Sequence, residues 1–115
     1  MNNDRKNDTT EKILGLIGIA RRAGKVTFGF DAVMQDVFKG RAKGVFLSDD
    51  ASERTSKKIH DACDEYKTRI TELMVSKSKL GAAIGRSDTA VIAVLDKSIA
   101  DRIAEIAGQN GNTEI

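Results

Sequence analysis

The sequence GKVTFGFDAVMQDVFKGRAK, residues 24–43, decides the fold. It predicts a short strand over residues 25–28, a turn at Gly29, and an amphipathic helix over residues 30–39 that Gly40 ends. Four apolar residues recur at the i, i+3, i+4, i+7 spacing of one buried helix face: Phe30, Val33, Met34 and Val37. That helix therefore needs an apolar surface to pack against.

Helix and strand patterns alternate along the rest of the chain. An apolar helical face precedes the central stretch, with a capping box from Asp8 to Glu11. The expected order after residue 43 is a strand over 45–47, a helix capped by Asp49 or Asp50, a strand over 69–75, a short helix over 76–85, a strand over 90–95 and a last helix capped by Asp96. The continuous apolar run at 90–95 is typical of a central strand covered on both faces. This alternation predicts an α/β fold with helices on both faces of a sheet.

Length and composition indicate a soluble protein with a single globular domain. We expect a disordered tail over residues 1–10, the domain over residues 11–107, and a flexible tail over residues 108–115. The absence of a long apolar run and of a signal peptide predicts a cytoplasmic protein that binds no membrane. One cysteine and one histidine are too few for a disulfide or a structural zinc site, so we expect no metal and no cofactor.

Basic residues gather in two stretches. Residues 21–43 hold six basic and two acidic side chains, whereas the whole chain has a formal net charge of +2. Lys77, Lys79 and Arg86 form a second group that has no acidic residue among them. Gly29 leaves the first amides of the following helix uncovered, and such amides donate hydrogen bonds to phosphate. Together these features predict an edge of the molecule that contacts RNA.

The sequence offers little support for catalysis. Asp49 and Asp50 follow a strand, but capping of the next helix explains them more simply. His60 and Asp64 have the spacing of a solvated helix-surface pair, and Cys63 falls on the inward face as a small core residue. The glycines match neither a phosphate-binding loop nor a dinucleotide fingerprint. We therefore expect no enzymatic activity.

Two segments carry a family resemblance. Leu80-Gly81-x-Ala83-x-Gly85, followed by the strand at 90–95, resembles the Leu-Gly-x-Ala-x-Gly signature of the kink-turn RNA-binding ribosomal proteins, such as archaeal L-seven-Ae and eukaryotic L-thirty-e. Gly29-x-Asp31 is similar to the Gly-x-Asn-Glu helix of that superfamily. The stretches LGLIGIARRAGKV and LSDDASERTSKKI resemble its bacterial YlxQ-like branch. The resemblance implies a three-layer α/β/α sandwich with a mixed four-stranded sheet.

The resemblance also implies which residues contact RNA. The residues at the start of the second helix that would enter the groove of a kink-turn are Gly29, Phe30, Asp31, Ala32 and Gln35. The loop residues that would pack on bulge nucleotides are Arg86, Ser87, Asp88 and Thr89. The expected phosphate contacts are Lys25, Arg41, Lys77, Lys79 and Arg86, with Arg21. Asp31, Ala32 and Gln35 stand where the family has Asn, Glu and Lys, so we expect weaker or differently tuned base recognition.

The leading hypothesis is a monomeric, non-catalytic RNA-binding protein of the bacterial ribosome or translation apparatus that recognises kink-turn or similarly bent RNA. A protein-interaction adaptor on the same fold is the alternative, because three base-reading side chains differ from the family pattern. A detached substrate-binding domain of an RNA-modifying enzyme is a third possibility. The natural RNA target is left open by the sequence.

Overall fold

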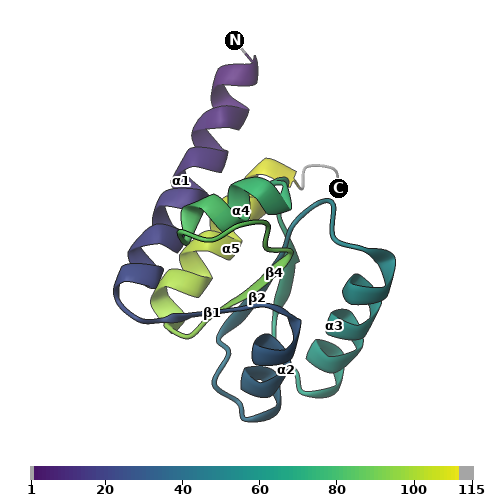
Figure 1. The fold of residues 1–115 in the computed structure, drawn as a ribbon. Coiled ribbons are helices and arrows are strands. Elements are labelled where there is room, and N and C mark those ends of the chain that lie inside the picture. Colours follow the sequence, from purple (N-terminus) through teal and green to yellow (C-terminus); the bar gives the residue numbers. More distant parts are fainter. Residues whose placement is uncertain (1, 112–115) are drawn as a thin grey trace.

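A computed structural model describes residues 2–111 of the chain, with side chains over residues 8–108. Five helices alternate with four strands (Figure 1). In chain order they are α1 (Asn2–Arg22), β1 (Val26–Phe28), α2 (Phe30–Phe38), β2 (Gly44–Leu47), α3 (Glu53–Glu65), β3 (Ile70–Glu72), α4 (Lys77–Ala83), β4 (Val91–Val94) and α5 (Lys97–Gly111). The strands lie in the order β1-β4-β2-β3. Strand β4 pairs antiparallel with β1 and β2, and β3 pairs parallel with β2. The predicted α/β fold with a mixed four-stranded sheet is confirmed.

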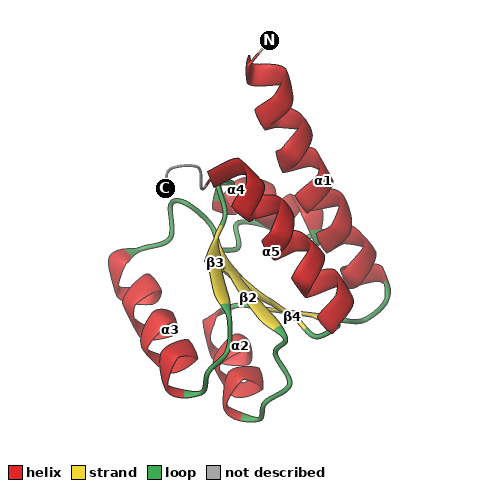
Figure 2. Cartoon of the chain, turned by 180° about the vertical axis from the view of Figure 1, so that it is seen from behind, coloured by secondary structure: helices red, strands yellow, loops and turns green. Residues whose placement is uncertain are grey.

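The pleat of the two inner strands divides the core into two halves. Phe46 and Ile92 point to the face covered by α1, α4 and α5, whereas their neighbours Val45, Leu47 and Val91 point to the face covered by α2 and α3. All of these side chains are buried. Figures 1 and 2 show the two helical layers on opposite sides of the sheet. The apolar run at 90–95 is therefore a central strand, as predicted.

The termini differ from the sequence prediction. Helix α1 begins at Asn2, so residues 2–10 are helical where a disordered tail is expected. No glycine or proline interrupts residues 2–14, which lets the helix extend before Asp8. Helix α5 continues to Gly111, so the first half of the predicted flexible tail is also helical. The remaining part, residues 112–115, lies outside the described residues.

Two short polar contacts set the ends of helices α3 and α4. The hydroxyl of Ser52 accepts the Thr55 N–H at 3.1 Å and caps α3, so the prediction that Asp49 or Asp50 caps this helix is wrong. The carboxylate of Asp50 instead accepts the backbone N–H of Lys77 at 2.8 Å, at the start of α4. This bond crosses from the loop after β2 to a segment distant in sequence, which no local pattern indicates.

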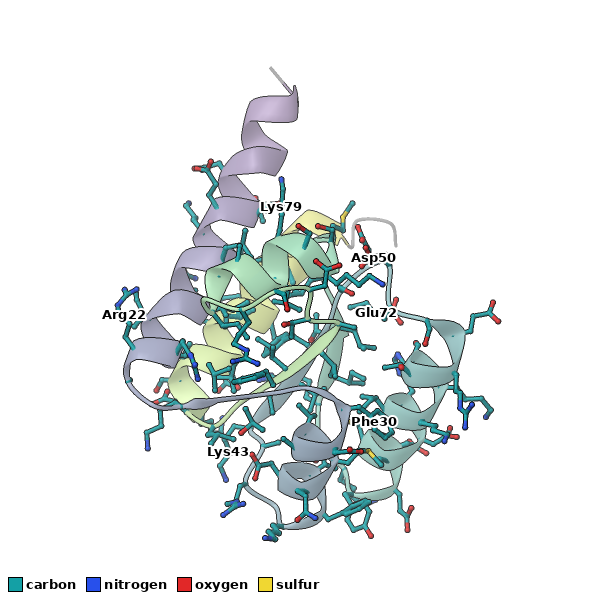
Figure 3. All side chains as sticks on the ribbon, viewed as in Figure 1. Arg22, Phe30, Lys43, Asp50, Glu72 and Lys79 are labelled. Atoms are coloured by element: carbon teal, nitrogen blue, oxygen red, sulfur yellow. The ribbon has the colours of Figure 1, made fainter. Side chains whose placement is uncertain are left out.

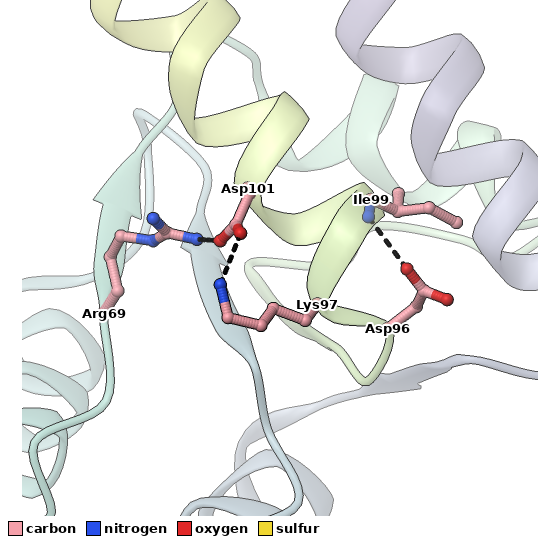
Figure 4. A network of polar contacts seen from close by, with 5 residues as sticks. All are labelled: Arg69, Asp96, Lys97, Ile99 and Asp101. Carbon is pink, nitrogen blue, oxygen red and sulfur yellow. Dashed lines mark hydrogen bonds and ion pairs between the residues drawn. The ribbon is translucent and has the colours of Figure 1, made fainter.

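Helix α5 is joined to the edge of the sheet by a small polar network (Figure 4). The Asp96 carboxylate accepts the Ile99 N–H at 2.9 Å, which is the predicted cap. Asp101 accepts hydrogen bonds from Lys97, at 2.6 Å, and from Arg69, the residue before β3. These two cations lower the pKa of the Asp101 carboxyl. No helix within the described residues is long and apolar enough to span a bilayer.

Candidate nucleic-acid interface

The β1–α2 turn and the α4–β4 loop face one another across a pocket of about 220 Å³. Six of the residues predicted to contact RNA line this pocket. The turn contributes Gly29 and Phe30, and the loop contributes Arg86, Ser87, Asp88 and Thr89. The fold thus brings together two segments that lie more than fifty residues apart in the sequence.

Gly29 shapes the turn side of the pocket. Its φ of 90° and ψ of 153° are a conformation that residues with a Cβ atom rarely adopt. The Gly29 N–H donates to the Val91 carbonyl at 3.1 Å, which fixes the turn against β4. No side chain among residues 8–108 caps the N-terminus of α2, so its first amides are free to donate to an external acceptor.

The loop side is held by contacts with α4. The carbonyl of Gly81 accepts the Arg86 N–H at 2.8 Å, and a Cβ atom at Gly81 would lie 1.8 Å from the Ser87 carbonyl oxygen. Thr89 is 7% exposed; its N–H donates to the Lys77 carbonyl, and its hydroxyl donates to the Ser87 carbonyl, both at 2.9 Å. The loop is therefore packed tightly on α4, and glycine at position 81 is what allows this approach.

Phe28 also lines the pocket, and it contacts Arg21 at the end of α1. Along β1, Val26 and Phe28 pack toward α1, α4 and α5, while Thr27 points the other way to Asp36. The guanidinium carbon of Arg86 lies 4.7 Å from the centroid of the Phe28 ring, and that of Arg21 lies 5.1 Å from it. The sequence pattern predicts Phe28 only as a strand residue. Its position directly before Gly29 is the signal that could have added it to the site.

The remaining helix residues predicted to contact RNA follow the outer face of α2. Asp31, Ala32 and Gln35 are exposed, and they border a shallow depression with an apolar floor that includes Phe30 and Met34. Gln35 lies one helical turn beyond Asp31, so both side chains project from the same side of the helix. This surface adjoins the pocket at Phe30, which is common to both.

The other predicted phosphate contacts do not line the pocket. Lys25 precedes β1, at the end opposite Gly29. Lys77 and Lys79 lie in α4, and Figure 3 shows Lys79 pointing away from Phe30. Arg41 follows α2 and pairs with the buried carboxylate of Asp36. Of the predicted cations, only Arg86 reaches the pocket wall.

Arg41 has a structural partner in Asp36, a carboxylate that is only 5% exposed. Arg41 donates to it from Nε at 2.9 Å and from Nη2 at 2.8 Å. The hydroxyl of Thr27 donates to the second carboxylate oxygen. The guanidinium therefore neutralises a buried charge at the far end of α2 from Gly29.

The residues weighed as catalytic candidates have structural surroundings. Cys63 is buried, as expected, and burial raises the pKa of its thiol to about 11. His60 Nε2 lies 2.9 Å from a carboxylate oxygen of Glu72 on β3, so the predicted pairing with Asp64 is wrong. Within the described part of the chain, no group of three or more His, Cys, Asp or Glu side chains is arranged to hold a metal ion.

The model of the ribosomal protein L7Ae/L30e/S12e/Gadd45 family matches residues 11–103. The chain is 38% identical to the RNA-binding protein YlxQ of Bacillus subtilis (strain 168) over 91 residues, which cover 79% of this chain and 90% of that protein. It is 34% identical to the RNA-binding protein YlxQ of Enterococcus faecium over 96 residues, covering 84% and 91% of the two chains.

Solved structures give the same fold. A protein of unknown function from Bacillus halodurans superposes with a TM-score of 0.79 at 33% identity, covering 84% of this chain and 96% of that one. The 15.5 kD RNA-binding protein of Giardia lamblia superposes with a TM-score of 0.70 at 23% identity, covering 89% and 87%, which is a likeness of fold alone. The family match and the named relatives support the expectation of a non-enzymatic protein. This chain belongs to the ribosomal protein L7Ae/L30e/S12e/Gadd45 family, in the branch of the bacterial YlxQ proteins.

Proposed function

We propose that this protein binds structured RNA without catalysis, at the pocket between the β1–α2 turn and the α4–β4 loop. The observation that carries the proposal is that an uncapped helix N-terminus and a rigidly held loop border the same pocket. Free amides at a helix N-terminus favour an anionic ligand, and RNA phosphates are such anions. The two YlxQ relatives are named as RNA-binding proteins, which supports the same ligand class.

The preferred target is a kink-turn or a similarly bent helix of ribosomal or other structured RNA. A straight A-form duplex offers a protein few accessible base edges, whereas a bent RNA with unpaired nucleotides exposes them. In the proposed complex, the start of α2 enters the widened groove, with Gln35 and Asp31 next to base edges. The loop from Arg86 to Thr89 then packs on the nucleotides of the bulge. The protein would stabilise bent RNA because it binds that form preferentially.

Shape and a few polar contacts would carry more of this recognition than charge alone. Lys25, Lys77 and Lys79 lie away from the pocket, and Arg41 is paired with Asp36. The expected number of phosphate contacts is therefore small, and the dependence of affinity on salt should be correspondingly shallow. Asp31 adds a negative charge beside the site, which limits affinity further.

The test is a titration of a standard kink-turn RNA against the same duplex without its bulge, at two salt concentrations. We expect at least tenfold tighter binding to the kink-turn, about 1.4 kcal/mol. Gln35→Ala is expected to narrow that difference, whereas Lys79→Ala, which changes a residue outside the pocket, should leave it intact. Equal binding to both RNAs would refute shape recognition, and a lack of binding to either would refute the RNA-binding proposal.

One observation favours the adaptor alternative. Phe38 and Tyr66 are 50% and 45% exposed, and their ring centroids lie 5.1 Å apart at the far end of α2 from the pocket. Aromatic residues are enriched at protein–protein interfaces relative to the rest of the surface. Purified ribosomal subunits separate the two proposals: if binding to them survives Gln35→Ala and Arg86→Ala but is lost with Phe38→Ser, a protein contact is the main attachment.

A further inference from the structure

Phe28 brings two cations together from distant parts of the chain. Arg21 lies in the last turn of α1, and Arg86 lies in the α4–β4 loop. Their guanidinium carbons lie 5.1 Å and 4.7 Å from the centroid of the same ring. Both distances are within the roughly 6 Å range of a cation–π contact, so the ring orients both side chains.

This arrangement has an electrostatic consequence. Since both guanidiniums contact one ring, their carbons lie within about 10 Å of one another, close to the Debye length of roughly 8 Å at physiological salt. Two positive charges at this separation repel one another weakly in the free protein. No acidic side chain among residues 8–108 forms an ion pair with either of them. An anion that both guanidiniums reach would relieve the repulsion.

We propose that Arg21, Phe28 and Arg86 form a clamp for one backbone phosphate of the bound RNA. The inference rests on the proposed function and extends it, because Phe28 and Arg86 line the pocket and Arg21 joins them from the end of α1. Guanidinium groups bind phosphate oxygens through paired hydrogen bonds, and two neighbouring guanidiniums can share one phosphate. Phe28 is the positioning residue: it touches no phosphate and holds both cations in place.

The location of the clamp sets the path of the RNA strand across the protein surface. The pocket receives the bent segment, and the clamp receives the strand that leaves it toward the end of α1. Arg22 follows Arg21 directly but belongs to another surface. Its side chain lies beside Gly18 and borders a depression between α1 and α5 with Ile19 and Arg102. Arg22 is therefore a matched control with the same charge, in the same helical turn.

The experiment compares Arg21→Ala, Arg22→Ala and Arg86→Ala in titrations of the kink-turn RNA and of the same duplex without its bulge, over several salt concentrations. We expect Arg21→Ala to weaken binding about fivefold or more and to make the salt slope shallower by about one, as expected for one lost phosphate contact. Arg22→Ala should change affinity less than twofold. Equal effects of Arg21→Ala and Arg22→Ala would overturn the clamp.

The double variant Arg21→Ala/Arg86→Ala tests whether one phosphate is shared. If both guanidiniums hold the same phosphate, the double variant loses less affinity than the product of the two single losses. Independent, multiplicative losses would mean two separate phosphates and overturn the proposal. Phe28→Leu keeps an apolar side chain in β1 and is expected to act like Arg21→Ala, with thermal unfolding as the check on its fold. Wild-type affinity for Phe28→Leu would overturn the positioning role.

The outcomes also separate this inference from the proposed function. If wild-type protein binds both RNAs equally but Arg21→Ala still has a lower RNA affinity than Arg22→Ala, the clamp proposal is supported and kink-turn recognition is refuted. If the kink-turn is preferred and the two variants behave alike, recognition holds and the clamp fails. A lack of binding to either RNA refutes both.

Discussion

A Cβ atom on Gly81 would lie 1.8 Å from the carbonyl oxygen of Ser87. Gly81→Ala must therefore displace the α4–β4 loop, because the clash is with backbone and no side-chain rotation can relieve it. We expect a loss of roughly 1–3 kcal/mol in the free energy of unfolding, typical of overpacking at a tight site. RNA affinity should fall as well, since Ser87 and its neighbours line the pocket. Urea unfolding and RNA titration measure the two effects.

Gly15→Ala is the matched control. A Cβ atom at Gly15 would meet nothing within 4 Å, and the residue lies inside α1. The substitution should raise the free energy of unfolding by roughly 0.5–1 kcal/mol through helix propensity and leave RNA binding unchanged. If Gly81→Ala proves as harmless as Gly15→Ala, close approach at Gly81 does not hold the loop.

Arg41→Ala is expected to affect stability and not RNA affinity. It removes two hydrogen bonds from the Asp36 carboxylate, which is 5% exposed. A buried carboxylate that loses its cation destabilises the fold, and because Arg41 itself is 58% exposed the loss should be moderate, roughly 1–3 kcal/mol. Lys39→Ala, at an exposed neighbouring position, should have almost no effect on unfolding. If Arg41→Ala weakened RNA binding without lowering the free energy of unfolding, Arg41 would be a phosphate contact and not a structural residue.

These positions mark the limit of what the sequence could predict. Helix α2 and strand β4 were predictable because burial imposes a period on their apolar residues, and both halves of the core follow from the pleat of Val45 to Leu47 and Val91 to Val94. The roles of Asp50 and Arg41 were not predictable. Each makes its decisive contact with a group that only the tertiary fold brings near, namely the Lys77 N–H and the buried Asp36.

In the candidate site, too, some residues could be predicted from the sequence and others only from the tertiary fold. Family-type motifs indicated Gly29 and the loop from Arg86 to Thr89, and the fold places both on one pocket. Charge also indicated Lys77 and Lys79, which are exposed but do not line this pocket. No sequence pattern indicates a role for Phe28 in the site, because the guanidiniums that it contacts, those of Arg21 and Arg86, come from segments far apart in the chain.

Cys63 should be nearly inert in the folded protein. Burial raises the pKa of its thiol from 9.0 to about 11, so at pH 8 the thiolate fraction is roughly a hundredfold smaller than in the unfolded chain. We expect alkylation by iodoacetamide to be at least that much slower in native protein than in urea. As the pH rises, the thiol ionises in the unfolded chain before it ionises in the folded protein. The contribution of Cys63 to the free energy of unfolding is therefore complete below pH 9 and declines as the pH rises toward 11. Rapid native alkylation at pH 8 would contradict the buried placement.

Asp31→Asn should tighten RNA binding. Asp31 is exposed in the first turn of α2, beside the amides that are proposed to face RNA phosphates. The asparagine keeps the size and the hydrogen-bonding oxygen of the side chain while it removes a charge that repels phosphate, and it restores the residue found in the wider family pattern. We expect roughly threefold to tenfold higher affinity at low salt, declining as salt screens the charge. Fluorescence titrations at about 50 mM and about 200 mM salt would measure this gain in affinity and its decline with salt.

The control for that substitution is Asp64→Asn, which makes the same change of charge on the exposed face of α3. If long-range charge alone governs binding, both variants gain affinity alike. If Asp31 lies at the interface, its variant gains more, and the gain is larger for the kink-turn than for the duplex without a bulge. A loss of affinity with Asp31→Asn would mean instead that the carboxylate accepts a hydrogen bond from a base, since a guanine imino or amino group donates more strongly to a carboxylate than to an amide.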